Sequence, residues 1–159
     1  MGRIVLDVDI DASPERVWEI ISDLEGAPER ISGIDKIEIT TEGPIGVGTE
    51  WRETRTMMGK EQTETMKIVA WEPGSHYTVY SYSCGSAFHW TMRVVPRRDG
   101  AKLETEMDYK AKTFLAKLMT PLGWLMSGFM KKCVMQDLQD AKTAAEGGTQ
   151  PSEAEAAPA

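Results

Sequence analysis

The stretch HYTVYSYSCGSAFHWTMRVV, residues 76–95, carries large apolar side chains at every second position on both sides of a Cys-Gly-Ser turn. A period of two is typical of a strand with one buried face, and two such runs around a short turn predict an antiparallel hairpin. Folding the stretch at this turn sets Val79 opposite Trp90 and Tyr77 opposite Met92. We expect these four side chains to share the buried face of a sheet.

The same period continues outward from about Ile34 to Lys112, interrupted by further glycine-containing turns. Six strands joined by short turns predict an antiparallel meander. Placing the tips at Gly59-Lys60, at Pro73-Gly74 and within residues 96–100 brings all apolar sets to one face, although a one-residue slip would reverse a whole strand. The further expected opposite pairs are Trp51 and Ile68, Arg55 and Glu64, Met66 and Ser81, Ile68 and Val79, Ala70 and Tyr77, Val94 and Leu103, Trp90 and Met107, and Phe88 and Tyr109.

The N-terminal part of the chain predicts one more strand and two helices. Residues 3–10 alternate apolar and polar side chains, as a half-buried strand does. Ser13 and Pro14 are a typical N-cap and first residue of a helix. A second, shorter helix is expected to end near Ile31.

The C-terminal part changes to a helical period. Apolar residues recur at three and four positions between Leu115 and Leu138, which predicts a long amphipathic helix. Pro121 and Gly123 are expected to kink this helix or to split off its first turns. The composition of residues 146–159 is typical of a disordered acidic tail, so we expect one folded domain over residues 1–145.

Composition and charge exclude several classes of function. The formal net charge is −7, and an acidic body argues against binding nucleic acid or an anionic membrane surface. Cys84 and Cys133 form no disulfide framework and have no metal-ligand spacing, so we expect no metal and no cofactor. The apolar stretch from 115 to 135 is interrupted by charges, which argues against stable membrane insertion. With no signal peptide pattern, we expect a cytoplasmic protein.

The opposite face of the predicted sheet is mostly charged and is expected to face solvent. It also carries Trp71, Tyr80 and Tyr82, which are either isolated surface aromatics or a patch through which a homodimer forms. His76 and His89 fall on this outer face as well. Two surface histidines argue against a catalytic site built from histidine and a serine or cysteine nucleophile.

Three sequence motifs carry a resemblance to a known superfamily. ASPERVWEIISD at residues 12–23, GPIGVGTEW at 43–51 and VAWEPG at 69–74 follow a first strand and precede a meander and a long helix. This order resembles the START-like, or polyketide cyclase/dehydrase-like, SRPBCC superfamily, over about residues 1–145. The resemblance implies an α+β helix-grip fold, in which a seven-stranded antiparallel sheet wraps around a long C-terminal helix and two short helices follow the first strand. It also implies a cavity for an apolar ligand between sheet and helix.

With this resemblance, the inward-facing side chains become candidates for binding a ligand rather than for filling a core. Methionine adapts its shape easily, which suits variable apolar guests. Tyrosine hydroxyls could add hydrogen-bond donors, although a buried tyrosine more often bonds a backbone group. The candidates are Trp51, Arg55, Met66, Ile68, Tyr77, Val79, Ser81, Phe88, Trp90, Met92, Met107 and Tyr109 on the sheet, and Met119, Met126 and Met130 on the helix.

Three charged residues, Glu53, Arg55 and Glu64, fall on the same inward face. Because an unpaired buried charge is costly, we expect Arg55 and Glu64, which are opposite in the predicted register, to form an ion pair. One interpretation is a half-solvated salt bridge near the edge of the sheet. The other is the polar end of a ligand pocket, in which Arg55 holds a carboxylate or carbonyl and a glutamate acts as general base.

Three functions remain open from the sequence. The first is a binding protein for a small hydrophobic molecule such as a lipid, a polyketide or an isoprenoid. The second is a cyclase, aromatase or dehydratase that uses Arg55 with Glu53 or Glu64 to move protons. The third is an interaction protein that docks a partner through Trp71, Tyr80 and Tyr82.

Overall fold

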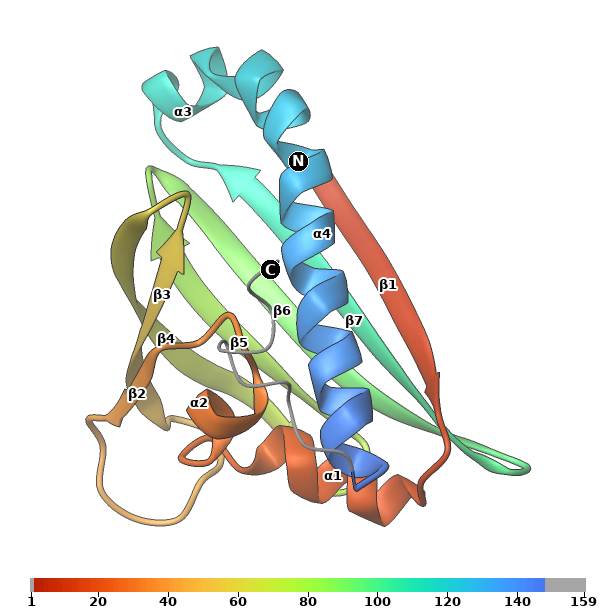
Figure 1. Ribbon diagram of the computed structural model, residues 1–159. Helices are drawn as coiled ribbons and strands as arrows, with labels where there is room; N and C mark the ends of the chain where they lie inside the picture. The colour runs from red at the N-terminus through yellow and green to blue at the C-terminus, as the bar shows by residue number, and fades with distance from the viewer. Residues whose placement is uncertain (1, 148–159) are drawn as a thin grey trace, which may run out of the picture.

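The computed structural model describes residues 2–147, apart from the side chains of Thr120, Gly123, Trp124 and Leu125. The predicted acidic tail therefore lies outside the described residues from position 148 onward. Within the described part, one antiparallel sheet of seven strands has the order β1-β7-β6-β5-β4-β3-β2 (Figure 1). The strands are β1 (Gly2–Ile10), β2 (Lys36–Ile39), β3 (Glu50–Met57), β4 (Lys60–Glu72), β5 (His76–Ser83), β6 (Ser86–Arg97) and β7 (Gly100–Ala111).

The helices stand where the sequence predicts them. α1 (Pro14–Ser22) and α2 (Ala27–Arg30) follow the first strand, and α3 (Phe114–Leu118) and α4 (Thr120–Ala145) follow the last. Ser13 caps α1, because its hydroxyl accepts a hydrogen bond from the backbone N–H of Arg16 at 3.2 Å. The predicted helix-grip fold is confirmed.

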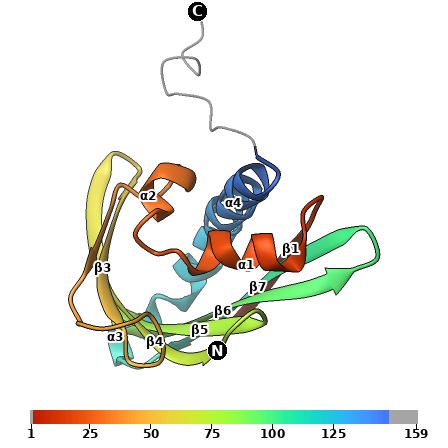
Figure 2. The same cartoon turned by 90° about the horizontal axis from the view of Figure 1, so that it is seen from below.

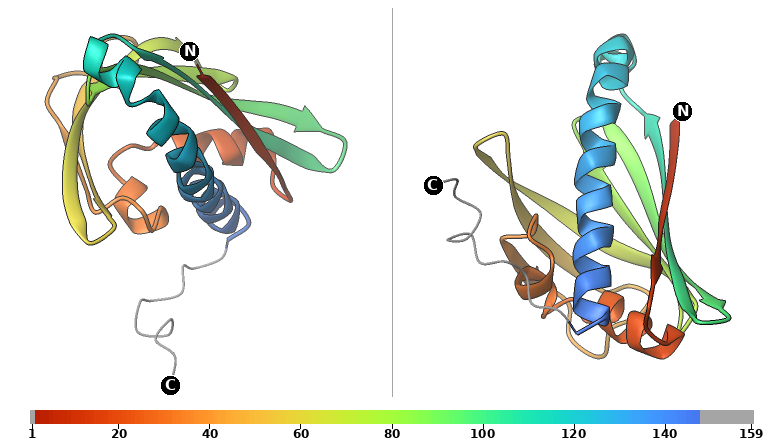
Figure 3. Two further views of the ribbon diagram at one scale, coloured as in Figure 1. Left: turned by 90° about the horizontal axis from the view of Figure 1, so that it is seen from above. Right: turned by 45° about the vertical axis from the view of Figure 1, so that its right-hand side comes forward.

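The sheet curves around α4, and α1 and α2 close one end of the curve (Figures 2 and 3). Fully buried side chains from the sheet and the helices pack together at this end, among them Val17 on α1, Leu103 on β7 and Leu138 on α4. Burial of this apolar surface supplies most of the free energy that holds the helix in the sheet. The core thus lies toward the α1 end of the molecule.

The predicted register of the central strands is confirmed. Val79 lies opposite Trp90, Tyr77 opposite Met92, Val94 opposite Leu103, Trp90 opposite Met107 and Phe88 opposite Tyr109. The β5–β6 turn consists of Cys84 and Gly85, both with positive φ (49° and 74°). This is the backbone of a tight two-residue hairpin turn, which fixes the pairing on either side.

The predicted pairing of β3 with β4 is wrong by two residues. Met58 and Gly59 form the two-residue turn with φ of 51° and 75°, so Met57 pairs with Lys60. Trp51 consequently faces Met66 instead of Ile68, and Arg55 faces Gln62 instead of Glu64. A shift of two keeps every side chain on its predicted face, which is why the facing pattern was right although the partners were not.

A bulge in β4 corrects the predicted position of Trp71. Ile68 pairs with Val79 as expected, but the next pair is Ala70 with Thr78, so Val69 is an extra residue. The facing pattern reverses beyond it, and Trp71 pairs with Tyr77 instead of joining the outer face. The rings of Trp71 and Trp18 lie 5.1 Å apart, and those of Trp71 and Tyr77 lie 5.6 Å apart. Trp71 is therefore part of the packing beneath α1.

The long helix is divided as predicted. α3 ends at Leu118, and α4 begins at Thr120 with Pro121 in its first turn, where the missing N–H costs nothing. The expectation that Met119 and Met126 face the sheet is wrong, because they are 48% and 40% exposed. α4 approaches the sheet only beyond them. No helix in residues 2–147 is long and apolar enough to cross a membrane.

Candidate functional site

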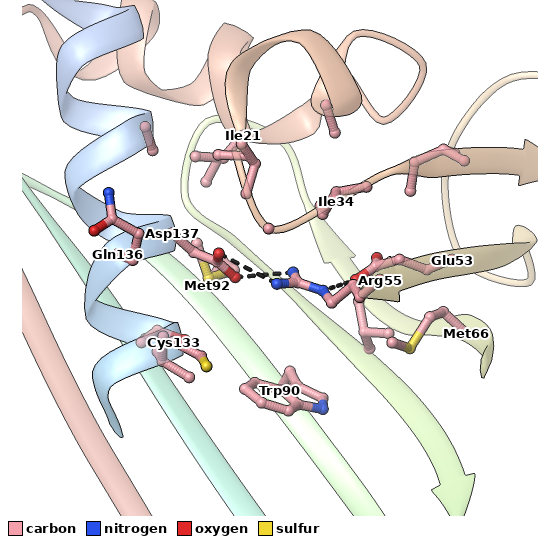
Figure 4. Close-up of a pocket in the computed structure, with 18 of the residues that line it drawn as sticks. Ile21, Ile34, Glu53, Arg55, Met66, Trp90, Met92, Cys133, Gln136 and Asp137 are labelled. Carbon is pink, nitrogen blue, oxygen red and sulfur yellow. Dashed lines mark hydrogen bonds and ion pairs between the residues drawn. The ribbon is translucent and has the colours of Figure 1, made fainter. Parts of the chain in front are cut away.

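A cavity of about 440 Å³ lies between the curved sheet and α4 (Figure 4). Its walls are mostly apolar and come from three sources, namely the strands, α4, and the segment that includes α1 and α2. The segment before β2 contributes Ile21, Leu24 and Ile34, among others. Space of this size remains because α4 packs beside β1, whereas β3 and β4 lie toward the opposite edge of the sheet.

The structure places eight of the predicted ligand-binding residues on this cavity. They are Trp51, Arg55, Met66, Tyr77, Val79, Trp90, Met92 and Met130. The structure shows that these residues line one cavity. That they bind a ligand stays a prediction. Both other predicted charged residues, Glu53 and Glu64, also border the cavity.

The remaining seven predicted residues do not line the cavity. Ile68, Ser81 and Met107 are buried at 0%, 1% and 3% exposure, but they are not among the residues that line the cavity. Phe88 and Tyr109 contact each other, with ring centroids 6.3 Å apart, toward the far ends of β6 and β7. Met119 and Met126 are exposed, as described above. Facing inward was therefore not sufficient to reach the cavity.

Arg55 on β3 is held between two carboxylates. Its Nε donates to Glu53 Oε1 at 2.6 Å, while Nη1 and Nη2 donate to the two oxygens of Asp137 at 3.2 and 2.8 Å (Figure 4). The second oxygen of Glu53 accepts a hydrogen bond from Trp51 Nε1 at 3.3 Å. A fork of this kind fixes the guanidinium plane and satisfies buried charges on both sides.

Asp137 was not among the predicted site residues. It lies on α4, four residues beyond Cys133, and extends from the helix toward the sheet (Figure 4). The sequence does contain a signal for it. Met130, Val134, Leu138 and Ala141 follow the apolar helical period, and an aspartate within that stripe is out of place unless a cation faces it.

The predicted ion pair between Arg55 and Glu64 is wrong. Glu64 lies directly opposite Glu53 across the β3–β4 pair, and it is half-buried at the cavity. Within residues 2–147 as described, no cation lies within ion-pair distance of Glu64. Three carboxylates therefore border the cavity together with the guanidinium of Arg55, while Arg30, which also lines the cavity, pairs with Asp23 at 2.7 Å. The group of Glu53, Glu64, Asp137 and Arg55 thus carries an excess of negative charge.

Burial shifts the pKa of the groups at this end. Burial acts to lower the pKa of Arg55, but the charges of Asp137 and Glu53 outweigh it and leave this pKa above its ordinary value. Burial raises the pKa of Asp137 above 3.8, although Arg55 opposes the shift. It also raises the pKa of the Cys133 thiol, which borders the cavity beside Asp137.

Tyr77 behaves as the sequence suggested for a buried tyrosine. Its hydroxyl donates to the backbone carbonyl of Ile21 at 3.0 Å. Burial, with a further contribution from the charge of Glu53, raises its pKa well above the ordinary value, so the hydroxyl stays protonated. Tyr77 therefore fastens α1 to the sheet and is not a free donor for a ligand.

The loop after α2 closes over the polar end of the cavity. Ser32 donates from its N–H and its hydroxyl to Asp140 Oδ2, at 2.9 and 2.6 Å, which ties the loop to α4. Gly33 follows directly, and a Cβ there would come within 2.9 Å of Arg55 Nη1 and 3.2 Å of Asp137 Oδ1. Glycine thus lets the backbone approach the ion pair closely. No cluster in residues 2–147 offers three or more His, Cys, Asp or Glu side chains to a metal ion.

Comparison with known proteins agrees with this fold. The model of the family described as polyketide cyclase/dehydrase and lipid transport matches residues 1–146. A comparison with curated proteins found no match.

Solved structures share the fold at low sequence identity. The Zhui aromatase/cyclase from Streptomyces sp. R1128 has a TM-score of 0.75 at 16% identity, covering 93% of this chain and 99% of that one. Ara h 8.0201 has a TM-score of 0.73 at 17% identity, covering 91% and 97%. Truncated norcoclaurine synthase from Thalictrum flavum has a TM-score of 0.69 at 19% identity, covering 93% and 95%. At these identities the likeness shows a common fold.

Proposed function

This chain belongs to the polyketide cyclase/dehydrase and lipid transport family, and on that premise we propose that it binds a small apolar molecule between the sheet and α4. The observation that carries the proposal is the cavity of about 440 Å³. Small-molecule sites in proteins typically measure about 300–1,000 Å³ and are mostly apolar with a few polar groups. Lipids, polyketides and isoprenoids all present the matching chemistry.

The polar end supports a narrower choice of ligand. An arginine has five N–H donors, and three of those on Arg55 already bond carboxylates. A ligand carboxylate placed there would approach Glu53, Glu64 and Asp137, so repulsion would oppose its binding. The guest we propose is therefore apolar with a hydroxyl or an amine at its polar end, and it carries no acid.

The test is competition among ligands that differ only in their polar group. A neutral polarity-sensitive dye is bound to the protein and is displaced with decanol, decylamine or decanoic acid. We expect decanol and decylamine to displace the dye at concentrations at least about tenfold lower than decanoate does. Equal or better displacement by decanoate would overturn the choice of ligand, and failure of all three to displace the dye would overturn binding in the cavity.

Glu64 and Glu61 offer a matched pair of variants for this experiment. Both lie on β4, but Glu64 borders the cavity and Glu61 is exposed. Glu64→Gln is expected to reduce the advantage of decylamine over decanol, because it removes the uncompensated carboxylate. Glu61→Gln should leave the relative potency of decanol, decylamine and decanoate unchanged. The same loss in both variants would mean that overall charge, and not the cavity, selects the ligand.

A second candidate function is catalysis, supported by the raised pKa of Asp137 beside a cavity. A carboxylate with a raised pKa is a better proton acceptor, and Arg55 could hold a substrate oxygen while Asp137 takes a proton. The sequence predicted Glu53, Arg55 and Glu64 as the candidate catalytic residues. Asp137 replaces Glu64 as the partner of Arg55 in this candidate mechanism.

Turnover of a linear polyketide analogue would test catalysis. Loss of a general base typically slows a reaction by about 10²–10⁴-fold, so Asp137→Asn should do so if the candidate mechanism operates. Turnover that is unchanged in Asp137→Asn, or equal to the uncatalysed rate in the wild type, would exclude it. The cytoplasmic location, the single domain of residues 1–145 and the absence of nucleic acid binding stay predictions.

Docking of a partner through the outer face has less support than the sequence suggested. Trp71 packs beneath α1, and the ring of Tyr80 lies 5.1 Å from that of His89. Of the three aromatic residues, Tyr82 is the one that is exposed, at 52%. Homodimer formation through this face stays a prediction, which sedimentation of the wild type and of Tyr82→Ser would test.

A further inference from the structure

The helical segment after β7 carries a patch of exposed apolar side chains, which we call the apolar tip. Isolated apolar residues are normal on a protein surface, whereas several exposed apolar residues in one segment are typical of an interaction site. The apolar tip consists of Phe114 (82% exposed), Leu115 (67%), Leu118 (65%), Met119 (48%), Leu122 (50%) and Met126 (40%).

The same segment has an unusual charge. Residues 111–136 contain four lysines and neither aspartate nor glutamate, in a chain whose formal net charge is −7. Lys112, Lys117, Lys131 and Lys132 are all exposed. They precede, interrupt and follow the apolar tip along the chain. The acidic body of the protein therefore ends in a basic segment with an apolar surface.

The position of the apolar tip connects it to the cavity. α3 and the start of α4 lie at the end of the molecule opposite α1 (Figures 1 and 3). Met126 is exposed, and Met130, one helical turn further along α4, lines the cavity. The apolar surface thus continues along one side of α4 from the outside of the protein to the space between helix and sheet.

We propose that the apolar tip docks on the surface of a membrane that contains anionic lipids. Apolar side chains of such a segment enter the boundary between head groups and acyl chains, while lysines contact the lipid phosphates. Charge complementarity favours this occupant over a second copy of the chain, because pairing two apolar tips would bring their lysines together. The docking goes beyond ligand binding, and it does not require the cavity to be filled.

The net charge of −7 belongs to the whole chain and does not describe the apolar tip. Attraction to a charged surface falls off within about one Debye length, roughly 8–10 Å in physiological salt, so the local charge of the docked segment decides. No part of the chain needs to cross the bilayer for this mode of binding. The acidic remainder of the protein would instead face away from the membrane and orient the molecule.

Co-sedimentation with vesicles tests the proposal. The full chain is mixed with vesicles of phosphatidylcholine alone or of phosphatidylcholine with phosphatidylserine, in low and in high salt. We expect the protein to pellet with the phosphatidylserine vesicles in low salt, and binding to fall at least about tenfold on neutral vesicles or in high salt. Equal binding to both vesicle types, or none to either, would overturn the proposal.

Two variants address the two halves of the surface. Leu115→Asp with Leu118→Asp removes the apolar contact, and Lys131→Glu with Lys132→Glu reverses the charge. Each is expected to weaken vesicle binding at least about tenfold. The control is Arg52→Glu with Arg98→Glu, which changes the net charge equally at two exposed positions outside the tip. A control that weakens binding as much as the lysine variant would overturn the localisation to the tip.

Sedimentation without vesicles completes the design. A dimer that forms in the wild type and disappears in the Leu115→Asp, Leu118→Asp variant, with no vesicle binding in either, would mean that the apolar tip joins two copies and would overturn membrane docking. Thermal unfolding of each variant verifies that it is folded. Because the exposed positions make few internal contacts, all variants are expected to unfold cooperatively as the wild type does.

Discussion

Asp137 on α4 accepts hydrogen bonds from the guanidinium of Arg55 on β3 with both carboxylate oxygens, at 3.2 and 2.8 Å. These two residues lie on opposite walls of the cavity, so their ion pair connects the two walls; we call this ion pair the strut. Glu53 bonds the third edge of the guanidinium and joins the strut to the sheet. The ion pair thereby joins the two walls at the polar end of the cavity, and apolar side chains line most of the rest.

Removing the arginine is expected to destabilise the fold. Arg55→Met leaves Glu53 and Asp137 facing each other without a cation, and loss of one partner of a largely buried pair costs on the order of 3 kcal/mol. Chemical denaturation measures the loss. The control is Arg52→Met on the exposed face of the same strand, for which the change should stay within about 0.5 kcal/mol.

A double-mutant cycle then isolates the strut. Asp137→Asn added to Arg55→Met removes one of the two uncompensated carboxylates, so the double variant should be more stable than the sum of the single changes predicts. Additive losses would mean that Arg55 and Asp137 contribute independently, in contradiction to the bidentate geometry.

The pKa of Asp137 predicts a direction of pH dependence. Burial holds this pKa above 3.8, so the folded state binds the proton more tightly than the unfolded state does. The stabilising contribution of this group is therefore complete below pH 3.8 and is lost as the pH rises through the folded-state pKa. Wild type should lose stability relative to Asp137→Asn across that interval. An NMR titration of the carboxyl carbon with a midpoint below 3.8 would contradict this, since the attraction of Arg55 would then exceed the cost of burial.

The bulge at Val69 predicts unequal roles for two aromatic residues of the sheet. Trp71 packs against Trp18 and Tyr77, whereas Tyr82 is 52% exposed. Trp71→Ala should lower the free energy of unfolding by about 3 kcal/mol, and Tyr82→Ala should change it by no more than about 0.5 kcal/mol. Equal losses of stability in chemical denaturation of the two variants would mean that Trp71 lies on the outer face, as the sequence predicted.

The sequence predicted the sheet well because its hairpin turns are short. Where a turn has a fixed two-residue form, as at Cys84 and Gly85, the pairing follows by counting, and Val79 meets Trp90. At Met58 and Gly59 the tip was misplaced by one residue, which moved every partner by two and left the facing pattern intact. A period of two thus predicts a face more reliably than it predicts a partner.

The sequence could not locate the bulge or the true partner of Arg55. The extra residue at Val69 has no recognisable signal in the local sequence, because the bulge serves the curvature of the whole sheet. Asp137 is 82 positions from Arg55, and only the packing of α4 into the sheet brings them together. Met119 and Met126 fit the helical period, but the period does not tell where along its length a helix leaves the sheet.

The most direct test of cavity binding is a titration with a neutral polarity-sensitive dye in the wild type and in two variants. Cys133→Phe adds a ring to a residue that lines the cavity, and Cys84→Phe adds the same ring at an exposed turn. We predict saturable binding of one dye per chain in the wild type and in Cys84→Phe, and at least about tenfold weaker binding in Cys133→Phe. Equal dye affinity in the wild type and Cys133→Phe, or no saturable binding in the wild type, would contradict ligand binding in the cavity.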